Sequence, residues 1–271
     1  MTASAKFYSL VNDGKHVCVG LDTDIKKIPP HLLKTDNPIV EFNKIVIENT
    51  IDGAAAYKIN FAFYEKDGTK GLENLHKTLK MIPQNILTIA DAKRGDIGNT
   101  SEMYAQSIFD HFKFDSVTLH PYMGYDSIEP FIKYHDKLNF ILALTSNKSS
   151  ADFEKLKLYD GRYLYQTVIQ KVNEWNANRN CGIVFGATNP LELKENIESF
   201  GDLAILLPGI GAQGGSLEDV VSTFRASSNN NYLINVSRAL LYCDSSPEFG
   251  GVINRTLAEL NNSIRTIEQK S

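Results

Sequence analysis

The stretch 86–96 of the chain reads ILTIADAKRGD, an apolar run that passes directly into a charged turn. Residues 86–90 are mostly aliphatic or β-branched, as in a buried strand of a sheet. Because side chains alternate along a strand, Asp91 and Lys93 should point to the same side. Asp96 then adds a second carboxylate. The stretch therefore predicts a strand whose carboxyl end carries side chains of opposite charge.

Seven similar β-rich runs lie elsewhere in the chain, and longer amphipathic stretches separate them. The runs are 16–22, 54–60, 116–120, 140–145, 182–185, 203–207 and 232–236. The amphipathic stretches, which are typical of helices, are 40–49, 72–80, 100–112, 163–175, 191–199, 217–224 and 251–267. This alternation predicts parallel strands joined by helices, and eight strands favour a closed (β/α)8 TIM barrel. An open, doubly wound sheet stays as the alternative, because alternation alone does not establish closure.

The length of 271 residues agrees with one domain, because a single barrel of this kind typically has about 250 residues. We therefore expect residues 1–271 to form one α/β domain with a helical extension at 1–14. The segment 149–162 follows the fifth predicted strand and carries no recognisable motif. We expect it to be a loop insertion.

Composition and charge argue against several classes of protein. The net charge is −4 and Lys and Arg do not collect in one segment, so we expect neither a nucleic-acid nor a membrane partner. No stretch approaches 18 apolar residues and the first residues resemble no signal peptide, which predicts a cytoplasmic protein. Cys18, Cys181 and Cys243 match no zinc or disulfide spacing. We therefore expect neither a zinc site nor a disulfide framework.

Polar side chains close several of the predicted strands, although the strands themselves are apolar. They are Asp22, Lys58, Asn60, Asp91, Lys93, Thr145, Ser146, Asn147 and Arg238. Burying such groups together is costly unless they pair, and the carboxyl ends of barrel strands meet at one mouth. This pattern predicts an active site at the mouth. A purely structural network of ion pairs is the alternative for the charged turn taken alone.

Residues 209–214 read GIGAQG and fit the GxGxxG pattern of dinucleotide-binding folds. The motif lies near the end of the chain instead of in its first βα unit, and Arg238 follows the next strand, where a ribose-binding acid is expected. An arginine there is compatible with NADP, so this alternative is weakened without being excluded. The same glycines suit a phosphate-binding loop, because barrels often bind phosphate after strands seven and eight.

The motifs together resemble the orotidine 5'-phosphate decarboxylase family, in particular its longer bacterial and apicomplexan-like branch. The stretch 91–100, DAKRGDIGNT, is similar to that family's signature. Supporting motifs occur in the family's order: GLD at 20–22, KIN at 58–60, LTSN at 144–147, PGIGAQGG at 208–215 and VSR at 236–238. The resemblance implies a barrel that converts orotidine 5'-phosphate to UMP and CO2, the last step of de novo pyrimidine nucleotide synthesis, without metal or cofactor.

The resemblance also implies a role for each residue of the charged turn. Lys93 would protonate the pyrimidine C6 as CO2 leaves, and Asp91 would lie beside the substrate carboxylate. Lys58 and Asp96 would complete the charge network. Three residues would reach into the site of the other subunit of a homodimer: Asp96, Ile97 and Thr100.

The same resemblance implies which residues bind the nucleoside part of the substrate. Asp22 would bind the ribose hydroxyls, helped by Lys58 and Asn60. Ser146 would read the pyrimidine ring, and the neighbouring Thr145 belongs to the same set of substrate-binding residues.

A last group of residues is implied for the phosphate end of the site. Gln213 and Arg238 would hold the 5'-phosphate, and Pro208 would close the side of the pocket.

Related barrel decarboxylases and aldolases for sugar phosphates, as a family trait, place a metal-binding carboxylate where this chain has Lys58. The lysine therefore favours the metal-free branch. That metal-dependent class, and a barrel that binds nucleotide without catalysis, stay as alternatives.

Overall fold

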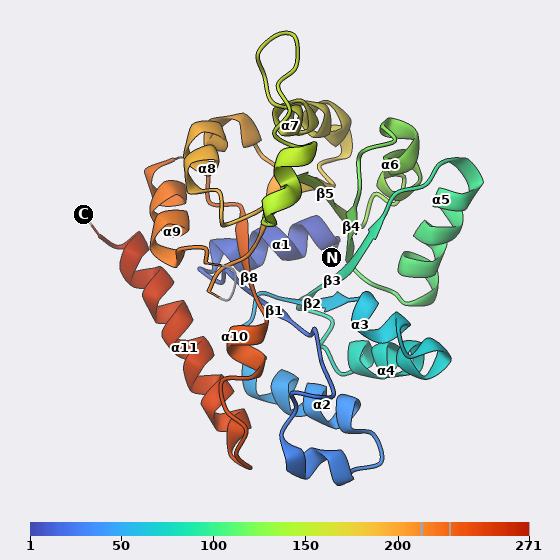
Figure 1. Ribbon diagram of the computed structural model, residues 1–271, viewed down its shortest axis with the longest axis vertical. Coiled ribbons are helices and arrows are strands. Elements are labelled where there is room, and N and C mark those ends of the chain that lie inside the picture. Colours follow the sequence, from blue (N-terminus) through green and yellow to red (C-terminus); the bar gives the residue numbers. More distant parts are fainter. Residues whose placement is uncertain (212–213, 228, 271) are drawn as a thin grey trace.

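A computed structural model describes residues 1–211, 214–227 and 229–270, and in these ranges eight parallel strands close into a barrel (Figure 1). The strands are β1 (Val17–Gly20), β2 (Ala56–Asn60), β3 (Leu87–Arg94), β4 (Ser116–Leu119), β5 (Leu138–Leu144), β6 (Cys181–Phe185), β7 (Ala204–Pro208) and β8 (Tyr232–Val236). Each strand pairs with the next in the chain, and β8 pairs with β1, where Val236 lies opposite Val19. The predicted closed barrel is confirmed. Closure excludes the open sheet, and with it the dinucleotide-binding fold considered for residues 209–214.

Helices surround the barrel on its outside (Figure 1). In the described ranges the α-helices are α1 (Ala3–Asn12), α2 (Pro38–Thr50), α3 (Ala62–Glu65), α4 (Gly68–Lys80), α5 (Gly98–Ala105), α6 (Tyr125–Ile132), α7 (Leu164–Trp175), α8 (Pro190–Asn196), α9 (Leu217–Ala226), α10 (Arg238–Leu241) and α11 (Phe249–Glu268). Short 3₁₀ segments are η1 (Pro30–Lys34), η3 (Lys148–Asp152), η4 (Asn176–Asn178) and η5 (Ile197–Phe200), and η2 (Gln106–His111) is π-helical. No helix in the described part of the chain is long and apolar enough to cross a membrane.

Every predicted helix is present, but the pattern missed α6 and the four-residue helices α3 and α10. Helix α6 has eight residues, starts after Gly124 at a φ of 81°, and contains Pro130. Glycine and proline interrupt the apolar periodicity that identifies a helix, which explains the omission. The single helix expected at 100–112 is divided into α5 and the π-helical η2.

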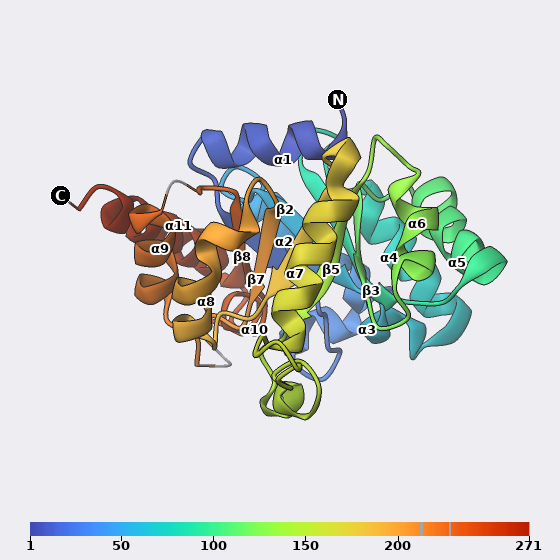
Figure 2. The same ribbon diagram turned by 90° about the horizontal axis from the view of Figure 1, so that it is seen from above.

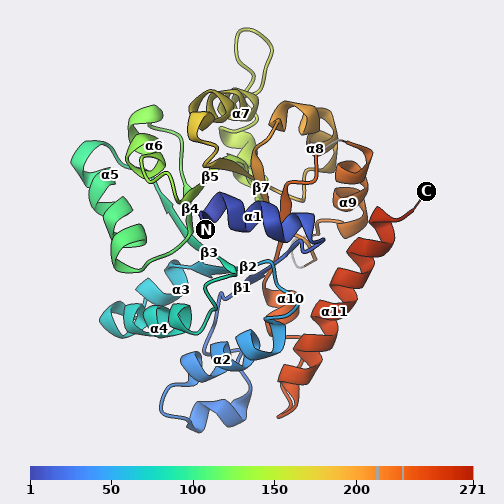
Figure 3. The ribbon, with the colours of Figure 1, turned by 180° about the vertical axis from the view of Figure 1, so that it is seen from behind.

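Helix α1 crosses the end of the barrel at which the strands begin (Figures 2 and 3). Its buried face presents Ala3, Phe7 and Val11. These side chains pack in one cluster with barrel residues such as Leu87 and Phe140, and the rings of Phe7 and Phe140 are 6.4 Å apart. Apolar packing therefore closes this end of the barrel and leaves the carboxyl ends of the strands for the functional site.

A buried polar group fastens the C-terminal helix α11 to the barrel. The fully buried His16 stacks on Tyr232 with 4.0 Å between ring centroids, and its Nδ1 lies 3.0 Å from the Tyr232 carbonyl oxygen. Glu268, at the end of α11, accepts a hydrogen bond from the Tyr232 hydroxyl (2.8 Å) and lies 3.3 Å from Nε2 of His16. Burial lowers the pKa of His16, although the Tyr232 carbonyl and Glu268 act in the opposite direction.

Candidate active site

A cavity of about 340 Å³ opens at the carboxyl ends of the barrel strands. Its floor is apolar and consists of Leu142, Val184 and Leu206. The predicted site residues that line it are Asp22, Lys58, Asn60, Asp91, Lys93, Thr145, Ser146, Pro208 and Arg238. The structure thus brings together residues that are up to 216 positions apart in the chain, because each lies in the carboxyl-terminal part of a strand of the same barrel or shortly after it.

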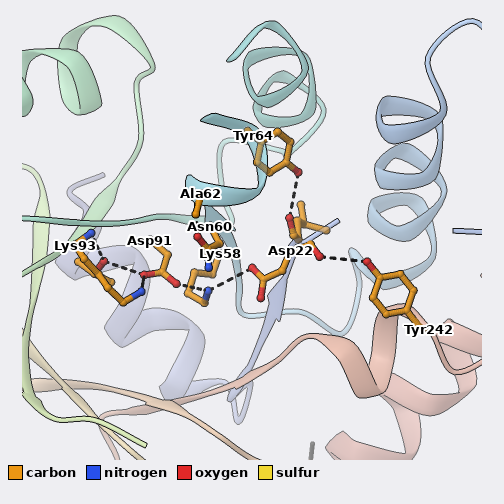
Figure 4. Close-up of polar contacts among 10 residues, drawn as sticks. Asp22, Lys58, Asn60, Ala62, Tyr64, Asp91, Lys93 and Tyr242 are labelled. Carbon is orange, nitrogen blue, oxygen red and sulfur yellow. Dashed lines mark hydrogen bonds and ion pairs between the residues drawn. The ribbon is translucent and has the colours of Figure 1, made fainter. Parts of the chain in front are cut away.

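Asp91 lies at the centre of a row of alternating charges (Figure 4). Its Oδ1 accepts a hydrogen bond from Lys93 Nζ at 2.5 Å, and its Oδ2 accepts one from Lys58 Nζ at 2.7 Å. Lys58 also lies 3.7 Å from Oδ1 of Asp22. Three adjacent strands or strand ends supply this row, and it runs across the mouth of the barrel.

The row is buried at Asp91 and Lys58 and open at Lys93. The Lys58 and Asp91 side chains are 5% and 9% exposed, whereas the Lys93 side chain is 51% exposed. Burial alone would raise the pKa of Asp91, but Lys58 and Lys93 outweigh burial and hold it well below its usual range. Burial alone would lower the pKa of Lys58, but Asp22 and Asp91 reverse the effect and raise it. Both buried groups are therefore charged at neutral pH.

The backbone of the charged turn is not a regular strand. Asp91 and Lys93 do face the same cavity, as predicted, but Lys93 has a φ of +46° and the pairing with β4 shifts register between Ala90 and Arg94. A residue with a Cβ enters this left-handed region only at an energetic cost. The Lys93 N–H donates to Oγ1 of Thr118 on β4 at 3.1 Å. Thr118 lines the cavity and was not among the residues predicted for the site.

The loop that carries Asp22 is held by two tyrosines that sequence reasoning also missed (Figure 4). The Tyr64 hydroxyl donates to the carbonyl oxygen of Leu21 (3.1 Å), and the Tyr242 hydroxyl donates to that of Asp22 (3.2 Å). Oδ1 of Asp22 is buried and has no hydrogen-bond partner in the described structure. The ion pair with Lys58 at 3.7 Å is the contact that the structure gives this oxygen.

The segment after β5 is anchored by a glutamate that the sequence did not single out. Glu154 accepts hydrogen bonds from the backbone N–H of Thr145 (2.7 Å) and from its hydroxyl (2.8 Å). On the opposite side, Gly186 follows β6, and a Cβ there would lie only 2.7 Å from the backbone nitrogen of Ser146. Thr145 and Ser146 are therefore fixed from both sides at the cavity wall.

The remaining wall of the cavity lies at the ends of β7 and β8. Arg238 is the first residue of α10 and Pro208 is the last of β7, and both line the cavity. Asn235 and Ser237 line it too, and their Oδ1 and Oγ are buried without hydrogen-bond partners in the described structure. Gln213 lies outside the described residues. This wall brings one cationic side chain, that of Arg238, to the cavity.

Three predicted residues do not line the cavity of their own chain. Asp96 accepts a hydrogen bond from the backbone N–H of Ile97 at 2.8 Å. Ile97 is 52% exposed, and Thr100, within α5, is exposed as well. Their expected contact with the site of another subunit stays a prediction.

Comparison with known proteins relates the whole barrel to one family. The model of the orotidine 5'-phosphate decarboxylase / HUMPS family matches residues 15–248. The orotidine 5'-phosphate decarboxylase of Porphyromonas gingivalis is 46% identical over 252 residues, which are 92% of this chain and 91% of that protein. That of Phocaeicola vulgatus is 43% identical, over 98% of this chain and 99% of that protein.

Solved structures agree with the sequence relatives. The Leishmania donovani OMP decarboxylase superposes with a TM-score of 0.84 at 37% identity and covers all of both chains. The Leishmania donovani UMP synthase also has a TM-score of 0.84, at 39% identity over 97% of this chain, but this chain covers only 56% of it. The resemblance inferred from the motifs is confirmed, and the chain belongs to the orotidine 5'-phosphate decarboxylase / HUMPS family.

Proposed function

We propose that this protein decarboxylates orotidine 5'-phosphate to UMP and CO2, as the last step of de novo pyrimidine nucleotide synthesis. The observation that carries the proposal is the buried carboxylate of Asp91 between the ammonium groups of Lys58 and Lys93, at the mouth of the barrel. Family membership and orotidine 5'-phosphate decarboxylase relatives above 40% identity support the same reaction.

In this proposal Lys93 is the acid of the reaction. When the bond between C6 and the carboxylate breaks, the electron pair stays on C6, where no neighbouring carbonyl can delocalise it as in a simple enolate. A fixed ammonium stabilises that localised charge electrostatically, and its proton then forms the new C6–H bond. The accessible Lys93 Nζ, which Asp91 holds by one hydrogen bond, suits both tasks. Solvent returns a proton to the lysine after CO2 and UMP leave.

Asp91 and Lys58 set the position of that ammonium. Asp91 accepts from both lysines through different oxygens, which fixes the carboxylate plane and with it the place of Lys93 Nζ. Both oxygens of Asp91 are thus bound to ammonium groups, which favours metal-free chemistry over the metal-dependent sugar-phosphate alternative. We propose no cofactor.

The other cavity residues bind the remote parts of the substrate. Asp22, which Lys58 approaches to 3.7 Å, and Asn60 would bind ribose hydroxyls, and Ser146, beside Thr145, would read the pyrimidine ring. Arg238 would hold the 5'-phosphate across the cavity. Two further residues complete this set: Pro208 as a side wall and Gln213 as a second phosphate ligand. Binding energy from the phosphate orients the ring although it lies far from the breaking bond.

A second copy of the chain is the proposed partner, in a homodimer that shares its active sites through Asp96, Ile97 and Thr100. Large apolar side chains are exposed around these residues, among them Ile97 (52%) and Met103 (55%). Tyr122 (75%) precedes α6, which packs against α5. Apolar surface collected in this way is typical of an interface. The place of the reaction in nucleotide synthesis supports a cytoplasmic enzyme.

The proposed reaction is tested by following the absorbance of orotidine 5'-phosphate with purified protein in the presence of EDTA. We expect the substrate signal to disappear and UMP to form. An unchanged signal with folded protein and fresh substrate would contradict the proposal. Binding of UMP without turnover would indicate a non-catalytic nucleotide-binding barrel, and turnover of a sugar phosphate only with a divalent metal would indicate the metal-dependent class.

A further inference from the structure

Thr118 is the point at which β4 touches both Asp91 and Lys93. Its hydroxyl donates a hydrogen bond to Oδ1 of Asp91 at 3.0 Å and accepts one from the backbone N–H of Lys93 at 3.1 Å. Thr118 is 2% exposed, so water does not compete for either bond. A hydroxyl has one hydrogen and an amide can only donate, so the direction of both bonds is fixed.

The hydrogen bond from the Lys93 N–H to Thr118 takes the place of a backbone hydrogen bond between β3 and β4. Between Ala90 and Arg94, β3 advances by four residues while β4 advances from Val117 to Leu119 only, so the ladder is interrupted at Lys93. In the same place the Lys93 backbone adopts the left-handed region with a φ of +46°. The Lys93 N–H is partly buried and would be costly to leave without a partner, and the Thr118 hydroxyl satisfies it.

We propose that Thr118 is a positioning residue for the decarboxylation, because its one hydroxyl fixes the Asp91 carboxylate and the Lys93 backbone relative to each other. The ammonium of Lys93 is then aimed into the cavity before the substrate arrives. Electrostatic stabilisation of this kind is effective when the charged group needs no reorganisation during the reaction. The inference rests on the proposed function of the site and adds Thr118, on β4, to the residues that serve it.

The test compares two substitutions of Thr118. Thr118→Val keeps the shape of the side chain and removes both hydrogen bonds. We expect kcat to fall about 10- to 100-fold, the range for a lost hydrogen bond to a charged group. KM for orotidine 5'-phosphate and the Kd of UMP should change less than about threefold, because the ribose and phosphate contacts are untouched. Thr118→Ser restores the hydroxyl and should keep kcat within about threefold of the unaltered protein.

The barrel offers a matched control in Thr88. The Thr88 hydroxyl donates to Oδ2 of Asp115 and accepts from the Asp115 backbone N–H, both at 3.0 Å. Thr88 is 6% exposed and lies near the start of β3, at the end of the barrel away from the cavity. Thr88→Val therefore removes the same pair of bonds, and we expect it to lower stability while kcat stays within about twofold.

Titration with UMP counts the intact sites of each variant, so that kcat refers to folded protein. Thr118→Ala repeats the test if Thr118→Val does not bind UMP. An unchanged kcat in Thr118→Val, or an equal loss in Thr88→Val, overturns the positioning role while the unaltered protein remains active. If neither Thr118→Val nor Thr118→Ala binds UMP, the hydroxyl serves folding and the inference is wrong. An inactive unaltered protein overturns the proposed reaction itself.

Discussion

Asp91 accepts three hydrogen bonds from side chains on three different strands. Lys93 and Thr118 donate to Oδ1, and Lys58 donates to Oδ2. A carboxylate held in this way stays ionised despite its burial, because the two ammonium groups outweigh the loss of solvation. The chemistry of the cavity therefore depends on one buried anion that fixes the cations around it.

Lys93→Ala tests the proton donor. We expect kcat to fall at least about 10³-fold, because the substitution removes both the electrostatic stabiliser and the acid. UMP binding should persist, since the proposed ribose and phosphate contacts, among them Asp22 and Arg238, are unaltered. Steady-state turnover and calorimetric titration with UMP measure the two effects. Lys66→Ala, which removes an exposed lysine paired with the neighbouring Asp67, is the control. Full turnover by Lys93→Ala would remove this residue from the mechanism.

The charged residues of the site could be predicted from the sequence, whereas the residues that hold them could not. Asp91, Lys93 and Lys58 are conspicuous because charge is unusual at the end of an apolar strand. Thr118 stands within the apolar run of β4, where a β-branched residue is ordinary strand composition. Tyr242 meets Asp22 only because β8 closes against β1, a contact that no local pattern contains.

The segment 149–162, expected to be a loop insertion, makes contacts with other elements that no sequence motif indicated. It begins in η3 and pairs Lys157 with Tyr163 as an antiparallel bridge. Lys155 forms an ion pair with Glu192 of α8, and Glu154 binds Thr145 at the end of β5. The segment is thus joined both to the outer helices and to the cavity wall. No sequence motif indicated these contacts, because they join the segment to elements that are distant in the chain.

Glu154→Ala should loosen the cavity wall at Thr145 and Ser146. Two hydrogen bonds to a carboxylate are lost, and we expect KM for orotidine 5'-phosphate to rise about tenfold with a smaller change in kcat. Glu154→Gln retains an acceptor oxygen, so its KM should lie between those of the unaltered protein and Glu154→Ala. Lys155→Ala breaks the neighbouring ion pair to Glu192 and should leave KM nearly unchanged. Equal effects of Glu154→Ala and Lys155→Ala would show that the segment acts only through its general stability.

The barrel could be predicted because its strand order is the order of the chain. Eight alternations of strand and helix suffice when each strand pairs with its successor. The contacts of Asp96 are harder to predict than the barrel. They are expected with a second subunit, and the pattern of one chain does not show how two subunits pack. The shared site therefore stays a prediction, which hybrid dimers test.

Mixing two inactive variants tests the shared site. Lys93→Ala and Asp96→Ala chains should each have little activity alone, and hybrid dimers should regain one intact site out of two. With equal amounts and random exchange, half of the dimers are hybrids, so about a quarter of the original activity is expected. Turnover is followed after exchange, which mass spectrometry of one isotopically labelled chain verifies. Verified exchange without recovered activity would contradict the donation of Asp96 across an interface.

The stability of the molecule should depend on pH through His16. Burial lowers its pKa in the folded protein, while the unfolded chain takes up a proton near pH 6.5. Below that pH the unfolded state therefore binds more protons than the folded state. The free energy of unfolding decreases as the pH is lowered, by at most about 1.4 kcal/mol per pH unit for this group. Urea unfolding between pH 8 and pH 5 measures the slope.

In that experiment His16→Gln should flatten the slope, because it removes the group that titrates. His135→Gln, which alters an exposed histidine, should leave the slope as it is. An unchanged slope in His16→Gln would assign the dependence to other groups.

The packing of α1 under the barrel determines how the gaseous product escapes. Beneath the cavity floor of Leu142, Val184 and Leu206 the interior is filled by side chains that include Phe7 and Phe140. A CO2 molecule set free beside Lys93 thus meets a blind end below it and has to depart through the opening by which the nucleotide entered. Any ligand that seals that opening would also trap the gas next to the reactive carbon, where recombination competes with escape.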